Sequence, residues 1–395
     1  MSTRIDRFRI VRELGSGTYG TVSLGRYNGN NYAIKRVSLE QPMQTLWEIS
    51  LYNLMSHPNI VSPFEYLSTP DYKNIDIIMP EAERTLRTAI TLGMTERDIR
   101  LVSWQLLSVM DYIHTNSIVH RDLKPTNILM DDIRVMVIDF GLARFLNRNT
   151  HLTSLRIQTY THRAPEVFKT LKAIEDNGPA REIAKTISTP MDIWSVGLMI
   201  LEMFLGYEYF YNRSNALSEN DVSEFLLGDG IKRIDRDISL LNASPEAKDV
   251  LRGLLRSDPS MRLSASQAMR MKWFSEMRYQ PAEKITYPTV KVNMESTTTK
   301  TIREAVDKLM KECGYTENVF TQMIKLVGEA YRNYPTTFTN VTVAQRYYEI
   351  LIMIAGAQIF EMRSEAIPGC GLDSVANVRD IYDVFKALRF NIIIQ

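Results

Sequence analysis

The stretch HRDLKPTNIL at His120–Leu129 decides how this chain is interpreted. It offers a carboxylate at Asp122, an ammonium at Lys124 and a carboxamide at Asn127, all within a few residues of one another. Three further strings accompany it in fixed order: GSGTYGTV at Gly15–Val22, AIK ending at Lys35, and DFGLAR from Asp139. Each string alone is ordinary, because glycine triplets and single charged residues arise by chance in many chains. Their combination and order are specific.

Together with APE at Ala164–Glu166, these strings form a motif set typical of phosphoryl transfer from ATP. Over roughly residues 8–280 the chain resembles the eukaryotic-type protein kinase family. The resemblance implies an α+β bilobal kinase domain over residues 1–280. It would comprise a small β-rich N-lobe at about 1–82 and a larger helical C-lobe at about 83–280.

The hydrophobic pattern predicts the same outline. From Phe8 to Leu39, β-branched and aromatic residues alternate with polar ones and Asn28-Gly29 supplies a turn, which predicts a strand meander. A helical pattern follows Pro42 and stops at His57-Pro58. Further expected elements are a strand at Ile75–Met79 and helices at Glu96–Asn116, Pro190–Leu205, Pro245–Arg256 and Ser264–Met271.

The glycine-rich string is the first part of the implied ATP site. Gly15, Gly17 and Gly20 would let a hairpin close over the phosphates, because side chains there would block the approach of the backbone. The resemblance implies that Val22 packs on the adenine. An ordinary hairpin turn explains this string equally well when it is considered alone.

The resemblance assigns the rest of the ATP site to a lysine, its ion-pair partner and the connection between the lobes. Lys35 would bind the α- and β-phosphates, held there by an ion pair with Glu48 on the first helix. Met79 would be the gatekeeper, and the backbone of Glu81 and Ala82 would hydrogen-bond the adenine. For Lys35 alone, a surface lysine on a strand is the simpler alternative.

The catalytic roles are also implied by resemblance. Asp122 matches the base that orients the substrate hydroxyl and accepts its proton, and Lys124 would neutralise the γ-phosphate, as in Ser/Thr kinases. Asn127 and Asp139 would hold Mg²⁺, which prefers oxygen ligands. ATP and Mg²⁺ are therefore the expected cofactors. His120 is expected to be a packed structural histidine rather than a general base.

The segment EQPMQTLWEISLYNLMSHPNIV at Glu40–Val61 resembles the helix of cyclin-dependent kinases that carries the PSTAIRE motif. By the same resemblance, Ser154 stands at the phosphorylated position of the activation segment, and Thr18 and Tyr19 match inhibitory phosphorylation sites or are simply loop-tip residues. Trp47 replaces an arginine that normally binds the activating phosphate. Losing a bidentate donor predicts weaker phosphate capture.

Residues 281–300, with two prolines and a Ser/Thr run, are predicted to be a linker before a helical block at 301–395. Within that block, Tyr347–Phe360 is apolar on all sides, which predicts a central buried helix. Surrounded by amphipathic helices, it resembles the N-terminal five-helix fold of cyclins. The resemblance implies an all-α cyclin-like domain that activates the kinase in cis, whereas an unrelated helical extension is the alternative.

Composition limits the partners. There are 47 Lys and Arg against 46 Asp and Glu, a net charge of +1, which gives no reason to expect a nucleic acid or a membrane surface as partner. The longest apolar stretch, Ile350–Ala357, is too short to span a membrane. Cys313 and Cys370 are the only cysteines, which favours an intracellular location, cytoplasmic or nuclear. The expected partners are a protein substrate and the cyclin-like domain in cis, and the oligomeric state stays open.

Two other functions compete with an active cyclin-dependent-type kinase. One is a pseudokinase scaffold whose tail recruits or dimerises partners. It is disfavoured because all five polar residues of the motif set are present: Lys35, Glu48, Asp122, Asn127 and Asp139. The other is an active kinase whose tail serves only for dimerisation or docking.

Overall fold

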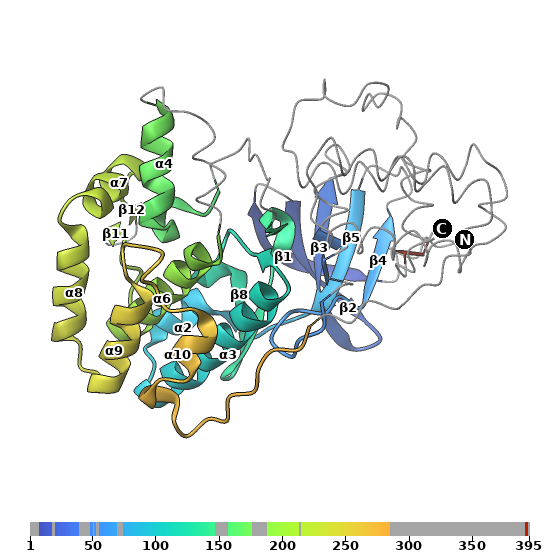
Figure 1. Cartoon of the computed structure of the whole chain (residues 1–395). Helices are drawn as coiled ribbons and strands as arrows, with labels where there is room; N and C mark the ends of the chain where they lie inside the picture. The colour runs from blue at the N-terminus through green and yellow to red at the C-terminus, as the bar shows by residue number, and fades with distance from the viewer. Residues whose placement is uncertain are drawn as a thin grey trace, which may run out of the picture.

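The computed structural model describes residues 8–17, 20–38, 48–49, 51–52, 55–68, 74–146, 157–175, 188–212, 215–284 and 392–393. Thr18, Tyr19, Trp47, Ser154 and nearly all of the tail lie outside the described residues. Figure 1 shows a twisted β-sheet on one side and a larger group of helices on the other. The bilobal part of the predicted fold is therefore confirmed, whereas the helical tail domain remains a prediction.

The sheet of the smaller lobe has the strand order β1-β2-β3-β5-β4-β13. Its strands are antiparallel except for the β13–β4 pair, which is parallel. The bounds are β1 Arg9–Gly17, β2 Gly20–Tyr27, β3 Asn30–Ser38, β4 Glu65–Ser68, β5 Asn74–Pro80 and β13 Ile392–Ile393. The predicted meander is thus present. Its β2–β3 turn is Asn28-Gly29, with φ of 49° and 81°, the left-handed conformation that a two-residue hairpin turn requires.

Gly20 begins β2 at a position that only glycine can occupy. Its φ is +145°, and a Cβ atom there would lie 1.9 Å from the carbonyl oxygen of Arg36 on β3. The missing side chain therefore lets the hairpin of β1 and β2 lie close to the next strand. The glycine is needed by the backbone of the sheet itself, whatever else the hairpin contacts.

The helices of the larger lobe surround one that is buried almost completely. This central helix is α6, where the side chains from Met191 to Met203 are all buried. The bounds of all the described helices are α2 Leu86–Leu92, α3 Glu96–Thr115, α4 Pro165–Glu175, α6 Thr189–Leu205, α7 Glu219–Leu227, α8 Gly230–Leu240, α9 Pro245–Leu254 and α10 Ala265–Met269. In Figure 1, α7 and α8 lie on the side of this lobe away from the sheet.

Short paired strands flank the loops that carry the HRDLKPTN and DFG strings. The pairs are β6 with β8, β8 with β9, and β7 with β10. Their bounds are β6 Arg84–Thr85, β7 Ile118–Val119, β8 Ile128–Asp131, β9 Arg134–Val137 and β10 Arg144–Phe145. The loop carrying HRDLKPTN therefore runs between β7 and β8, and the DFG segment follows β9.

The expected strand at Ile75–Met79 and the four expected helices are present as β5, α3, α6, α9 and α10, with ends that differ by a few residues. Helices α2, α4, α7 and α8 were not among the expected elements. Among the described residues, no helix has the length and apolar character needed to cross a membrane. Of the tail, only Ile392 and Ile393 are described, and they pair with Tyr66 and Leu67 of β4.

His57 lies in the connection from the Glu48 helix to the sheet. Its Nδ1 accepts the backbone N–H of Asn59 at 3.1 Å, and its Nε2 lies 3.1 Å from the hydroxyl of Ser108 on α3. Because Nδ1 accepts a hydrogen bond, the ring is neutral there. Burial lowers the pKa of the His57 imidazole from 6.5 to about 4.

This arrangement predicts a loss of stability in acid. Between pH 6.5 and about 4 the unfolded chain binds a proton at His57 that the folded chain does not, so the free energy of unfolding falls as the pH falls. His57→Gln, which can still accept from Asn59, should show a smaller fall. Thermal unfolding of both proteins across this range measures the difference, and parallel curves would contradict the prediction.

Candidate active site

Lys35 points from the sheet toward the helical lobe because of the strand alternation. Ala33 and Val37 on the same face of β3 belong to the large core that continues into the helices, whereas Ile34 belongs to a small separate cluster on the other face. Lys35 pairs in register with Val22 on β2 and Ile77 on β5, so it lies in the middle of the sheet.

The Lys35 ammonium contacts two carboxylates from different elements. Its Nζ lies 2.7 and 2.9 Å from the two carboxylate oxygens of Glu48 and 3.0 Å from Oδ1 of Asp139. Burial alone would lower the pKa of Lys35, but these two carboxylates outweigh it and raise the pKa. Burial would likewise raise the pKa of Asp139, yet Lys35 holds that pKa below its ordinary value. Burial raises the pKa of Glu48, and Lys35 opposes that rise. The expected contact between Lys35 and Glu48 is therefore formed, with Lys35 held between the two acidic side chains.

Asp122 lies at the centre of a second cluster. Its Oδ2 accepts from Lys124 Nζ at 2.8 Å, and its Oδ1 accepts both the hydroxyl and the backbone N–H of Thr159 at 2.8 and 3.0 Å. Lys124 also donates to the Thr159 hydroxyl at 2.9 Å. This network fixes the carboxylate in one orientation. A hydroxyl group brought to it would meet a carboxyl oxygen beside the Lys124 amine, an arrangement that suits proton abstraction from an alcohol.

A buried aspartate on α6 supports the loop around Asp122. Asp192 is fully buried and accepts the backbone N–H groups of His120 and Arg121 at 2.8 and 2.9 Å. The His120 side chain is fully buried too, with Nε2 3.1 Å from the carbonyl oxygen of Ile138 and its ring 4.7 Å from that of Phe140. These contacts give His120 the structural role expected for it.

Asn127 and Asp139 fit the expected magnesium site chemically. The Asn127 amide donates to the carbonyl oxygen of Asp122 at 2.8 Å and to its Oδ2 at 3.2 Å. Because these bonds use the NH₂ group, the carboxamide oxygen is left to act as a ligand. Asp139 is partly exposed, with 23% of its side-chain surface accessible. An amide oxygen and an ionised carboxylate are ligands that Mg²⁺ prefers.

The other expected ATP-binding residues lie on the strands of the sheet or directly after them. Gly15 pairs with Val22 and Gly17 with Gly20 in the β1–β2 hairpin, and Val22 packs against the large core. Glu81 and Ala82 follow β5, where the chain passes from the sheet to the helices. Gly15, Val22 and Lys35 are therefore in one row across three strands, while the contacts of all these residues with ATP remain predictions.

Glu166, of the APE string, forms a buried ion pair with Arg262. The two guanidinium Nη atoms lie 2.8 and 2.9 Å from the two carboxylate oxygens, and the Arg262 side chain is fully buried. Arg262 also donates to the carbonyl oxygen of Pro190 at 2.7 Å. This bidentate pair joins α4 to the segment before α10 and to the start of α6, as the kinase resemblance implies.

Sequence reasoning missed a polar network below the segment that precedes APE. Gln158 has a left-handed φ of 62°, and its buried amide donates to the carbonyl oxygen of Met191 and to the Ser195 hydroxyl. Nearby, the buried pair His162–Glu202 has an Nε2–Oε2 distance of 3.1 Å. Gln158 and His162 are polar residues beside the APE string, and this local polarity was the available signal in the sequence.

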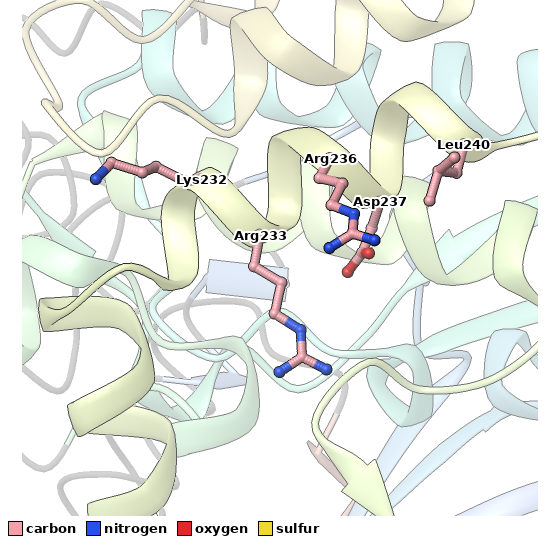
Figure 2. Close-up of a pocket in the computed structure, with 5 residues that line it drawn as sticks. All are labelled: Lys232, Arg233, Arg236, Asp237 and Leu240. Atoms are coloured by element: carbon pink, nitrogen blue, oxygen red, sulfur yellow. The ribbon is translucent and has the colours of Figure 1, made fainter.

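Figure 2 shows a surface hollow away from these groups, along α8. Its lining residues are Lys232, Arg233, Arg236, Asp237 and Leu240. Asp237 accepts the phenol of Tyr209 at 2.5 Å, and Lys232 pairs with Asp229 at the surface. Acidic groups therefore offset part of the basic charge here, and nothing else in the hollow indicates a ligand.

Comparisons with known proteins agree with this geometry. Residues 8–274 match the family model of the protein kinase domain. The chain is 28% identical over 342 residues to mitogen-activated protein kinase 10 of Oryza sativa subsp. japonica, which covers 77% of this chain and 54% of that protein. It is 28% identical to mitogen-activated protein kinase 12 of Danio rerio, over 72% of this chain and 83% of that protein.

A third relative is the probable CTD kinase subunit alpha homolog of Encephalitozoon cuniculi (strain GB-M1). It is 29% identical over 67% of this chain and 83% of that protein. The chain belongs to the protein kinase family, as the motif set predicted. It spans about half the length of the first rice relative and 58% of two others from rice.

The Glu166–Arg262 pair predicts a large stability effect. Arg262→Ala leaves the Glu166 carboxylate buried without its partner, which should lower the free energy of unfolding by about 3–5 kcal/mol. Arg252→Ala is the matched control, because Arg252 pairs at the surface with Asp235 and should contribute less than about 1 kcal/mol. Urea unfolding of both variants measures this, and equal effects would contradict the prediction.

Proposed function

We propose that this chain is an ATP-dependent protein serine/threonine kinase. The observation that carries the proposal is a pair of charged clusters: Asp122 with Lys124 and Thr159, and Lys35 with Glu48 and Asp139. The clusters are near enough for Lys124 to contribute to the lowered pKa of Asp139. Asn127 links the first cluster to the expected metal site through its bonds to Asp122. Membership of the protein kinase family supports this reading.

The residues divide the chemistry between them. Asp122 orients the substrate hydroxyl and accepts its proton as the oxygen attacks the γ-phosphorus of ATP. The bond from this phosphorus to the bridging oxygen breaks, and ADP leaves. Lys124 and Lys35 stabilise negative charge on the phosphates, and Glu48 keeps Lys35 in place. Asn127 and Asp139 would hold Mg²⁺, which supplies positive charge to the phosphate oxygens when bound.

Two substitutions test this mechanism. Lys35→Met and Asp139→Asn should each lower phosphoryl transfer to a protein substrate by about 10³-fold or more, because both remove charge that faces the nucleotide. Lys232→Met, in an exposed ion pair on α8, is the control and should leave transfer unchanged. A radiolabelled assay measures transfer, and circular dichroism spectra check that each variant is folded. Activity within tenfold of wild type in either site variant would contradict the mechanism.

We further propose that the kinase is of the cyclin-dependent type, with a cyclin-like tail that activates it in cis. The Glu40–Val61 string and the helical pattern of residues 301–395 support this. One part of the tail also lies on the N-lobe, since β13 adds to the edge of β4, the strand that follows the Glu48 helix in the chain. A scaffold without activity is the alternative, and the transfer assay separates the two.

Removal of residues 286–395 tests the tail. If the tail favours the inward position of the Glu48 helix, its loss should lower kcat by about tenfold or more, because a partner shifts an equilibrium by its differential affinity. In the full chain, Trp47→Arg should also lower kcat, because it places a charge at the proposed apolar contact. Full activity of the shortened protein would leave the kinase assignment standing and remove the tail's role.

A further inference from the structure

Tyr52 is a buried residue that the mechanism above does not use. It stands one helical turn after Glu48 on the same helix, and only 4% of its surface is exposed. Its phenol oxygen lies 3.1 Å from Oε1 of Glu48 and 2.9 Å from the backbone nitrogen of Asp139. Side chains four residues apart on a helix are neighbours, which brings the hydroxyl to the Glu48 carboxylate.

The hydroxyl can satisfy both contacts at once. A phenol carries one proton and two lone pairs, so it donates to the Glu48 carboxylate and accepts the N–H of Asp139. Burial, reinforced by the carboxylates of Glu48 and Asp139, raises the pKa of Tyr52 well above its ordinary value. The phenol therefore keeps its proton, and the direction of both hydrogen bonds is fixed.

These bonds close a ring of contacts around the Lys35 ammonium. Lys35 contacts Glu48 and Asp139, and the Tyr52 hydroxyl contacts the same two residues. Three elements that are separate in the chain are thereby joined: β3, the Glu48 helix and the DFG segment.

The contact with Asp139 involves a residue whose backbone conformation is strained. Asp139 has a φ of 68°, in the left-handed region that non-glycine residues adopt only when their surroundings hold them there. Its N–H is bound by the Tyr52 hydroxyl, and the next residue, Phe140, packs edge-on against the Tyr52 ring with centroids 5.7 Å apart. A phenylalanine at position 52 could keep the ring contact but would leave the N–H without this acceptor.

We propose that the Tyr52 hydroxyl is a positioning group for phosphoryl transfer: it holds the Glu48 carboxylate and the Asp139 backbone in the arrangement that orients Lys35 and the metal-binding carboxylate. Tyr52 touches neither substrate nor nucleotide in this role. It stabilises the conformation in which the helix is turned inward and Phe140 is packed, and so raises the fraction of molecules able to react.

Tyr52→Phe in the full-length protein tests the proposal. Loss of one buried hydroxyl with two partners should lower kcat by about 10-fold to 100-fold, with the KM for ATP changed less. The matched control is Tyr112→Phe, which removes another buried hydroxyl, one that accepts the backbone N–H of Ser56 at 3.0 Å away from the site. It should lower the melting temperature without lowering kcat.

A binding measurement separates positioning from a general loss of stability. Two ATP-competitive inhibitors are compared, one that requires Phe140 in its packed position and one that requires Phe140 displaced. In Tyr52→Phe the ratio of their Kd values should shift about tenfold or more toward the second inhibitor, and in Tyr112→Phe it should stay constant. Tyr52→Leu, which also lacks the hydroxyl, should behave like Tyr52→Phe and serves if the first variant folds poorly.

An unchanged kcat together with an unchanged Kd ratio in a folded Tyr52 variant overturns the proposal. Only the kcat measurement rests on the proposed kinase activity; the ratio of inhibitor Kd values does not. If the wild-type protein transferred no phosphate, the proposed function would fail, and the inhibitor ratio would still decide whether the Tyr52 hydroxyl stabilises the packed conformation.

Discussion

The ammonium group of Lys35 is the point on which the candidate active site depends. It is almost buried, with 11% of its side-chain surface exposed, and both of its carboxylate partners come from other elements. A buried charge is stable only when its partners are in place, because removing one leaves another charge desolvated. The sheet, the Glu48 helix and the DFG segment must therefore assemble together. The contacts of Lys35 with both carboxylates form only when all three are in place.

The same region concentrates strained backbone. Arg121, Asp139 and Gln158 all have left-handed φ values, between 62° and 68°, which cost roughly 1–2 kcal/mol for a residue with a side chain. Each is held by a hydrogen bond with a buried side chain: Asp192 binds the N–H of Arg121, Tyr52 binds the N–H of Asp139, and Arg163 binds the carbonyl oxygen of Gln158. The strain therefore persists because the surroundings fix each of these peptides.

Much of this architecture follows from the sequence, for reasons that differ between residues. The meander and α3 could be predicted from local pattern, since alternation, the Asn28-Gly29 turn and apolar spacing act over a few residues. The Glu166–Arg262 pair spans 96 positions, so only the resemblance to a family could suggest it. The role of Tyr52 depends on a contact across 87 positions that no motif records, and helical periodicity by itself identifies Tyr52 only as a core residue. The tail, apart from Ile392–Ile393, lies outside the described residues, so its periodicity still stands as a prediction.

A polar network holds residues 157–163 against α6. His162 uses both ring nitrogens, at 3.1 Å from Thr161 Oγ1 and 3.1 Å from Glu202, and its carbonyl oxygen accepts the Ser195 hydroxyl at 2.9 Å.

Arg163 adds bonds to the carbonyl oxygens of Ile157 and Gln158 at 3.0 and 3.1 Å. Hydrogen bonds are directional, whereas apolar contacts tolerate sliding, so this network fixes the backbone of residues 157–163 from the C-lobe side.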